Sequence, residues 1–337
     1  MCESSAGKTE IESIDMAGAR EIKNRIKSIQ DTMKITRAMY MMSSMKVRKA
    51  RQKLENTEPY FESLQEQISE ILYHFPEMEH LYFDNRSEDQ EETVKKKGYI
   101  IVTGDKGMAG AYNHNVIKEA ERVIGDAKDC RLFVLGEVGR SHFRSRKLPV
   151  EEDFHYSTSN PSIHRARVIT ELMVELYQKE ELDEIYIIYT RMVNSLKEEV
   201  EVKRLLPLKT HDFIEQERLE EARKNQLADK QDLGEEYGLQ EYDTGEYIIY
   251  PSPKQLLDNI VYNYVTGFLY GVLVEAFASE ESARMMAMQS ATDNADAMLH
   301  ELSIEYNRVR QAAITQEITE VIGGAKALKK KKKKQVR

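Results

Sequence analysis

The chain has 337 residues and a net charge of −9, and 32% of its residues are charged, so much of it must be exposed to solvent. It has no tryptophan, seven prolines and 15 methionines. This composition favours long amphipathic helices over an all-β fold, because proline interrupts helices and methionine fits irregular helical contacts. The two cysteines, Cys2 and Cys130, exclude a disulfide framework and match neither thiol-catalysis nor zinc spacing. No secretory signal is expected, because no basic region followed by an apolar run opens the sequence.

The first predicted element is a coiled-coil helix over residues 16–58, and residues 1–15 before it are expected to be a disordered extension. Between residues 17 and 54 it carries eleven Lys or Arg against Glu21 and Asp31, so this helix needs an acidic neighbour. One row of residues recurs at alternating spacings of four and three: Ile22, Ile26, Ile29, Met33, Thr36, Tyr40, Ser43, Val47, Ala50 and Leu54. This heptad seam predicts a left-handed coiled coil. A break and restart is expected at Pro59.

A helical connection over residues 59–97 is expected to lead into a Rossmann-like α/β domain over residues 98–208. Strands are expected at 98–102, 131–135 and 184–190, and helices at 110–124, from 137 onward and at 161–178. This alternation is typical of a three-layer sheet domain.

A glycine-rich turn follows the first of these strands and enters a helix, which is where a nucleotide site is found in many α/β proteins. A phosphate-binding P-loop needs Gly-Lys-Ser/Thr, but here Lys106 is followed by Gly107 and Met108. The dinucleotide motif needs glycine spacings of two and three, but Gly104, Gly107 and Gly110 are spaced three and three. The turn is therefore expected to serve close packing, and no cofactor is expected. The eight histidines show no metal-site spacing, so no metal is expected.

Residues 209–252 are expected to form an acidic, variable excursion. The part from 209 to 246 holds twelve acidic and five basic residues, and three glycines interrupt it.

The last predicted element is a C-terminal coiled-coil helix over residues 253–328, followed by a disordered lysine-rich tail over residues 329–337. The stretch 259–278 is long enough to span a bilayer, which takes about 20 apolar residues. Its polar residues, including Glu275, instead favour a helix buried against the middle domain. A second seam follows at Met285, Met288, Thr292, Ala295, Leu299, Leu302, Tyr306, Val309 and Ala313.

Two seams of one kind predict a helix pair, and the small residues in both favour a thin, close contact. The pair must be antiparallel, because the first helix enters the middle domain and the last helix leaves it. The last helix is expected to outrun its partner. The sequence thus predicts an α/β protein in which a long antiparallel coiled coil of the N- and C-terminal helices carries an inserted Rossmann-like three-layer domain.

Several stretches resemble the gamma subunit of F-type ATP synthases. At the N-terminal end these are residues 16–22, 34–39 and 46–50, and at the C-terminal end Ser279-Glu280 and residues 283–288, 306–317 and 323–325. The glycine-rich turn ending in Tyr112-Asn113 is similar too. The resemblance covers roughly residues 16–328 and is weakest at about 205–245. Gly104 and Ala109 stand where the family commonly has Ser and Cys, and no regulatory cysteine pair is visible, so thiol control is not expected.

The resemblance implies a central rotary shaft without a catalytic site of its own. It would transmit torque between a proton-driven membrane ring of c subunits and a catalytic ring of alpha and beta subunits, and would regulate ATPase activity and proton flow. It also implies the epsilon subunit as a partner and a peripheral location on the cytoplasmic face of the cell membrane. Motif by motif, it implies that Arg310 and Gln311, with Thr315 nearby, form a catch for a beta-subunit loop. Lys34, Arg37 and Met39 would face an acidic beta-subunit segment.

Two other functional classes stay open on the residues alone. A nucleic-acid-binding coiled-coil protein could use the basic first helix and the lysine tail to bind phosphates, although the resemblance implies no nucleic-acid partner. A nucleotide-dependent enzyme could be built on the middle domain, and it would bind ATP or NAD there.

Overall fold

A computed structural model describes residues 6–75, 80–83, 95–125, 130–193, 198–210, 212–213 and 252–335. Its contacts divide the chain into two compact units. The globular unit comprises Ser43–Arg284, and the helical unit comprises Met1–Met42 together with Met285–Arg337. The long helices α1 (Ala6–His74) and α6 (Pro253–Gln335) each contribute to both units. The acidic excursion predicted at 209–252 lies almost wholly outside the described residues.

The globular unit is built on a four-stranded sheet with the strand order β2-β1-β3-β4. Strand β1 (Lys97–Val102) pairs in parallel with β2 (Cys130–Leu135) on one side and β3 (Glu184–Met192) on the other. Strand β4 (Glu198–Leu206) pairs antiparallel with β3 and was not predicted from the sequence. Its first seven residues are charged or valine and only partly covered, so the strand lacks the apolar run by which the buried strands were recognised.

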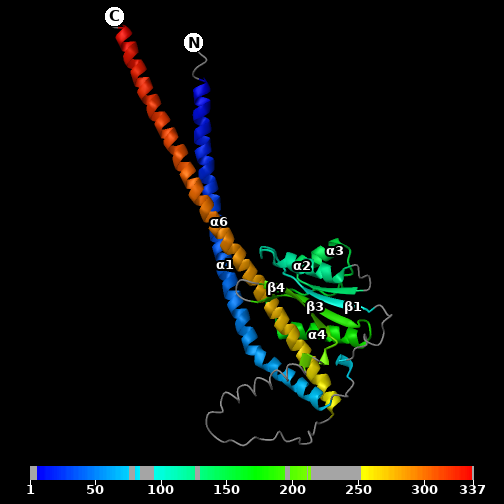
Figure 1. Cartoon of the computed structure of the whole chain (residues 1–337). Helices are drawn as coiled ribbons and strands as arrows, with labels where there is room; N and C mark the ends of the chain where they lie inside the picture. The colour runs from blue at the N-terminus through cyan, green and yellow to red at the C-terminus, as the bar shows by residue number, and fades with distance from the viewer. Residues whose placement is uncertain are drawn as a thin grey trace, which may run out of the picture. The chain divides into compact units, whose positions relative to one another are not determined.

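Helices cover both faces of this sheet, as Figure 1 shows. Tyr99 and Ile101 of β1 pack against α2 (Tyr112–Ile124) and α3 (Glu137–Ser145). The alternate residues Ile100 and Val102 pack on the opposite face, in a core shared with α4 (Ile163–Gln178), the end of α1 and the start of α6. Successive strand residues point to opposite faces, so each face has its own core. The predicted three-layer α/β architecture is confirmed.

Helix α1 continues through Pro59 to His74, so the expected break at this proline is wrong. A proline inside a helix costs about 3 kcal/mol. Beyond it, however, α1 buries Leu64, Ile68 and Ile71 in the core, and full burial of each such side chain contributes about 1.5–3 kcal/mol. Burial therefore outweighs the proline, and the first part of the predicted connection, residues 59–74, is a continuation of α1.

The two ends of the chain also differ from expectation, because α1 begins at Ala6 and α6 runs through the lysines to Gln335. The structure has helix over 6–15 and 329–335, within the two stretches for which disorder was predicted. Adding a residue to an existing helix is far easier than starting a new one, and Lys, Ala and Glu are good helix formers.

The apolar start of α6 is a core element of the globular unit. By length and composition α6 could cross a membrane, but 61% of its most apolar window is buried within the protein. Leu257, Val261, Val265, Leu269 and Leu273 all lie in the main core. The prediction that residues 259–278 form a buried helix is confirmed.

In the helical unit, the paired helices meet along the predicted seam. The seam residues from Ile22 to Tyr40 of α1 are buried or half-buried, and the residues between them from Arg20 to Ala38 are exposed. The seam of α6 shows the same pattern from Thr292 to Ala313. At its most buried level, the Thr36 and Thr292 hydroxyls lie 2.7 Å apart in a hydrogen bond. The first residues of α1 and the last residues of α6 lie at the same end of this unit (Figure 1), so the pair is antiparallel as predicted.

Candidate partner-contact surfaces

The exposed face of α1 in the helical unit is strongly basic. The side chains of Arg20, Lys23, Arg25, Lys27, Lys34 and Arg37 are all exposed. Among the described residues, an ion pair is recorded for Lys34 alone of these six, with Asp31 at 2.9 Å. The hydrogen bond and charge of Lys34 lower the pKa of the Asp31 carboxyl. Most of the positive charge on this face is left for a partner.

The three α1 residues singled out for an acidic partner do not all point the same way. Lys34 and Arg37 are exposed and lie three residues apart, hence on one face of the helix. Met39 is half-buried and lies beside the seam residue Tyr40. A partner that reaches the two cations would therefore meet only part of Met39.

The predicted catch residues of α6 are all exposed. Gln311 and Thr315 are four residues apart and point away from the seam formed by Val309 and Ala313, and Arg310 flanks them. The Thr315 hydroxyl donates a hydrogen bond to the Gln311 carbonyl at 2.8 Å, which leaves its oxygen free to accept one. The structure therefore leaves all three residues exposed, with Gln311 and Thr315 on one outward face of α6 and Arg310 between that face and the seam.

An exposed apolar stripe on α6 was missed from the sequence. Its members are Ile304 (58% exposed), Ile314 (46%), Ile318 (54%), Val321 (72%) and Ile322 (50%). They lie off the heptad seam, so the heptad pattern that predicts the helix pair does not select them. Ile314, Ile318 and Val321 recur at helical spacing, which is the signal that could have found them. Large exposed apolar patches mark interaction sites, so we expect a partner to bind this part of α6.

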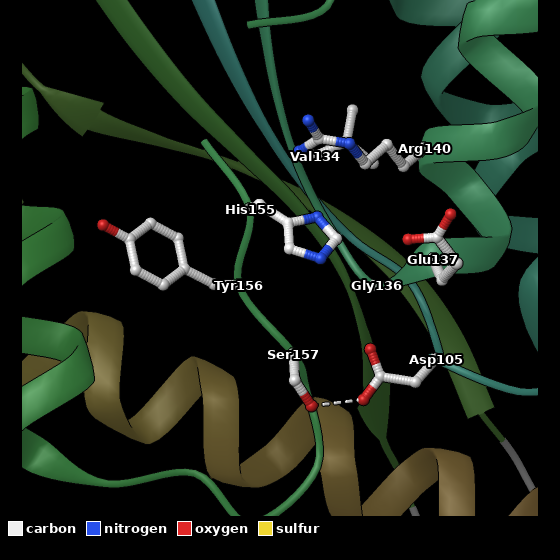
Figure 2. A pocket seen from close by; sticks show the side chains of 8 residues that line it. All are labelled: Asp105, Val134, Gly136, Glu137, Arg140, His155, Tyr156 and Ser157. Atoms are coloured by element: carbon white, nitrogen blue, oxygen red, sulfur yellow. Dashed lines mark hydrogen bonds between the residues drawn. The ribbon is translucent and has the colours of Figure 1, made fainter. Parts of the chain in front are cut away.

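The glycine-rich turn after β1 borders a small pocket at the C-terminal edge of the sheet (Figure 2). The pocket encloses about 100 Å³ and is lined by Asp105, Gly136, Glu137, Arg140 and His155, among others. Drug-sized ligands occupy pockets of about 300–1,000 Å³, so the space falls well short of a nucleotide.

The charged groups of this pocket are engaged by the protein itself. The Asp105 carboxylate accepts hydrogen bonds from the Ser157 and Ser159 hydroxyls at 2.5 and 2.8 Å. Burial alone would raise the pKa of Asp105, but these bonds and two backbone amides hold it below its usual value. The buried Arg140 donates to the backbone carbonyls of Glu152 and Phe154. The turn therefore fastens one loop to another, in agreement with the predicted packing role.

A network of buried charges lies in the globular unit, where α1 and α6 run beside this turn. Arg284 of α6 holds Glu280 and Glu281, and Glu281 also accepts hydrogen bonds from Ser43 and Lys46 of α1. The two carboxyl groups are only 5% and 2% exposed. The resemblance placed Glu280 and Arg284 in a family motif but gave no contact with α1, because Ser43 and Lys46, which bond Glu281, lie more than 200 positions away in the chain.

Comparison with known proteins gives consistent results. A family model described as ATP synthase matches residues 18–328. The ATP synthase gamma chain of Ruminiclostridium cellulolyticum is 43% identical over 310 residues, which cover 92% of this chain and 98% of the relative. The sodium ion specific ATP synthase gamma chain of Acetobacterium woodii is 38% identical over 309 residues, covering 92% and 98%.

Among solved structures, a chain of the Euglena gracilis mitochondrial ATP synthase matches with a TM-score of 0.59 at 15% identity, covering 93% of this chain and 95% of that one. A chain from the central stalk and c-ring structure of the Tetrahymena thermophila mitochondrial ATP synthase matches with a TM-score of 0.51 at 21% identity, covering 76% and 99%. At these identities, the two structures show that the fold is shared.

Proposed function

Because this chain belongs to the gamma-chain family of ATP synthases and is therefore the central rotor shaft of the complex, we propose that its paired helices turn inside a ring of alpha and beta subunits. The observation that carries this proposal is the combination of the basic face of α1 and the exposed apolar stripe of α6. Both surfaces belong to a helix pair whose own contact buries only a narrow seam. Such a pair is suited to enclosure by other subunits.

The catch would consist of Arg310 and Gln311, with Thr315 beside them, hydrogen-bonded to a beta-subunit loop. All three are exposed: Gln311 and Thr315 lie on the side of α6 that faces away from its seam, and Arg310 lies beside the seam. Hydrogen bonds to a charged group such as the Arg310 guanidinium contribute about 1.5–3 kcal/mol each. A contact of that size favours one orientation of the shaft over others and can still be broken within a catalytic cycle.

The basic face would meet an acidic beta-subunit segment through Lys34 and Arg37, with Met39 at the edge of the contact. Exposed ion pairs are worth only about 0–1 kcal/mol each. Weak pairs suit a moving contact, because strong ones would hold the rotor in one position. The same weakness makes this contact sensitive to salt.

The shaft would act on catalysis through differential contact. An asymmetric shaft presents a different face to each of three equivalent sites, and each site shifts toward the conformation that the face before it favours. ATP chemistry would then take place on partner subunits, and this chain would have no catalytic site of its own. The small pocket beside Asp105, with its charges engaged internally, agrees with this division.

The family places the chain in the membrane-associated part of the synthase as a peripheral subunit. Its globular unit would contact the epsilon subunit and the membrane c-ring, on the cytoplasmic face of the cell membrane. A role as a nucleic-acid-binding coiled coil is not favoured, because the family match covers residues 18–328.

Affinity purification from native membranes tests the proposed assembly. The chain should be recovered with alpha and beta subunits in one complex, and a native mass measurement should give its stoichiometry. Recovery of the chain alone from gently solubilised membranes would contradict the proposal. Salt-dependent binding of the isolated chain to duplex DNA, with no recovery of ring subunits, would support the nucleic-acid alternative instead.

A further inference from the structure

Two neighbouring carboxylates of α6, Glu280 and Glu281, serve different parts of the globular unit, and one guanidinium holds both. Arg284 donates from Nη2 to Glu280 Oε1 at 2.5 Å and from Nη1 to Glu281 Oε1 at 2.7 Å. Arg284 itself is only 9% exposed. The planar fork of arginine can bond two acceptors at once in a fixed geometry, which a lysine ammonium cannot reproduce.

Glu281 is the connection to α1. Its Oε2 accepts a hydrogen bond from the Ser43 hydroxyl at 2.7 Å, and its Oε1 accepts one from Lys46 Nζ at 2.9 Å. Burial alone would raise the pKa of Glu281, but Lys46, Ser43 and Arg284 together hold it below its usual value. Because Ser43 and Lys46 are three residues apart on one face of α1, the carboxylate fixes the register of the two helices at this level.

Glu280 is the connection to the sheet. A side chain on Gly104 would place its Cβ 2.8 Å from Glu280 Oε1, so the glycine-rich turn lies directly against this carboxylate. The turn is held in shape by a bond from the Gly104 amide to Asn113 Oδ1 at 2.7 Å.

Two further hydrogen bonds attach the same stretch of α6 to the sheet layer. Tyr112 Oη donates to the Ala276 carbonyl at 3.2 Å, and Ser279 Oγ donates to the Thr190 carbonyl at 3.1 Å. The first comes from the start of α2 and the second ends on β3. The glycine-rich turn, the start of α2 and the end of β3 are therefore all held against about one turn of α6.

We infer that Arg284 is a positioning residue that joins α1, α6 and the sheet into one stiff joint, through which torque passes between the globular unit and the helices. A buried charge network adds little net stability, and apolar replacements are often as stable. It differs from an apolar contact in that it has one geometry, since every donor must meet its own acceptor. Apolar packing alone would let α6 slide or rotate slightly under load. This inference rests on the proposed rotor function.

The test measures torsional stiffness in the assembled complex. The ring of alpha and beta subunits is fixed to a surface, a bead is attached to α2 of the globular unit, and the angular fluctuation of the arrested rotor is recorded. Arg284→Gln leaves two buried carboxylates without their shared partner, so the variance of the angle should widen about twofold or more. Arg284→Lys, which can satisfy one carboxylate at a time, should lie between this variant and the wild type.

Lys179→Gln is the matched control. It removes an exposed pair with Glu175 in α4 and should leave the variance unchanged. If Arg284→Gln does not assemble, Ser43→Ala and Lys46→Gln carry the test, because each removes a single bond to Glu281, and each should widen the variance. An unchanged variance in the Arg284→Gln complex, or in both single-bond variants where that complex does not form, overturns the inference. Failure of the wild-type chain to assemble with the ring counts against the proposed function instead.

Discussion

At the edge of the sheet, one glycine, Gly136, allows the chain to pass close to the neighbouring strand end. Gly136 follows β2 with φ at +87°, and a Cβ there would lie 2.2 Å from the backbone oxygen of Thr103. The Thr103 oxygen belongs to the backbone and has little freedom to move. Only glycine therefore fits where β2 leaves the sheet toward α3.

Gly136→Ala should destabilise the protein by about 2–4 kcal/mol, because the side chain meets both a strained backbone conformation and a backbone clash. Urea unfolding of the purified chain measures the change. Gly107→Ala is the matched control, since nothing lies within 4 Å of its added Cβ, and it should change stability by no more than about 0.5–1 kcal/mol. Equal effects of the two substitutions would contradict this account.

Glu198, at the start of β4, links stability to pH. Burial raises its pKa from 4.5 to about 7. Its charge also acts on the buried Tyr112, whose pKa is raised chiefly by burial and next by Glu280 and Glu198. A carboxyl whose pKa is raised in the folded state holds its proton more tightly there than in the unfolded chain. Its contribution is therefore most favourable below pH 4.5 and is lost as pH rises through about 7.

Glu198→Gln should remove this dependence and raise Tm at pH 8 by about 2–4 °C, the shift that 1 kcal/mol produces in a domain of this size. Thermal melts at pH 5 and pH 8 test it, with the exposed Glu62→Gln as the control. The gain should appear at pH 8 and be smaller at pH 5. An equal gain at both pH values would show that the carboxyl does not titrate as described.

At the scale of elements, sequence periodicity recovers the helix pair because the seam repeats across many turns. Every residue from Ile22 to Tyr40 that the heptad pattern selects is buried or half-buried in the structure. Features that depend on one partner far along the chain were not recoverable in this way. The bonds of Glu281 to Ser43 and Lys46 join residues 238 and 235 positions apart, and no local pattern marks them. The helix break predicted at Pro59 is wrong because it considers only the local effect of proline, whereas the burial of residues further along α1 keeps the helix intact.

The catch surface of α6 gives a prediction at this scale. Replacing Arg310 and Gln311 together with Ala should lower the ATPase turnover of the assembled complex by roughly tenfold, which corresponds to about 1.4 kcal/mol of lost contact energy at the rate-limiting step. Assembly should be intact, because both side chains are exposed and none of the seam is altered. The double variant of the neighbouring exposed residues Asn307 and Arg308 to Ala is the control. Unchanged turnover in the first variant would count against the catch.

At the scale of the whole molecule, the fold could be predicted because it depends on long, repeated patterns in the sequence, whereas the rotor function was implied by the family resemblance. The sheet domain was placed by its apolar strands, and the shaft by its two seams. The surfaces that partners would cover were harder to find. A basic face shows in the sequence. The stripe of Ile314, Ile318 and Val321 also recurs there at helical spacing, but only the structure shows that these side chains are exposed.

Two segments in the last part of α6, residues 317–322 and 329–334, are expected to differ in their importance for assembly. Deleting Lys329–Lys334 should leave assembly and ATPase activity nearly unchanged, because the run adds only positive charge beyond the stripe. Deleting six residues from Glu317 to Ile322 should instead reduce assembly, because it removes three of the five apolar side chains of the stripe. Native gels of complexes assembled with each chain distinguish the two. A comparable loss of assembly in both variants would contradict the proposed role of the stripe.

The exposed stripe has a consequence for how a cell must make this protein. If the proposed ring covers the stripe, a newly synthesised chain carries these isoleucines in water until it is assembled, and the stripes of two such chains can pack against each other. Surplus copies are thus the first to be lost to self-association. Production of the chain must therefore keep step with that of its partners, and its concentration alone says little about how many working machines the cell holds.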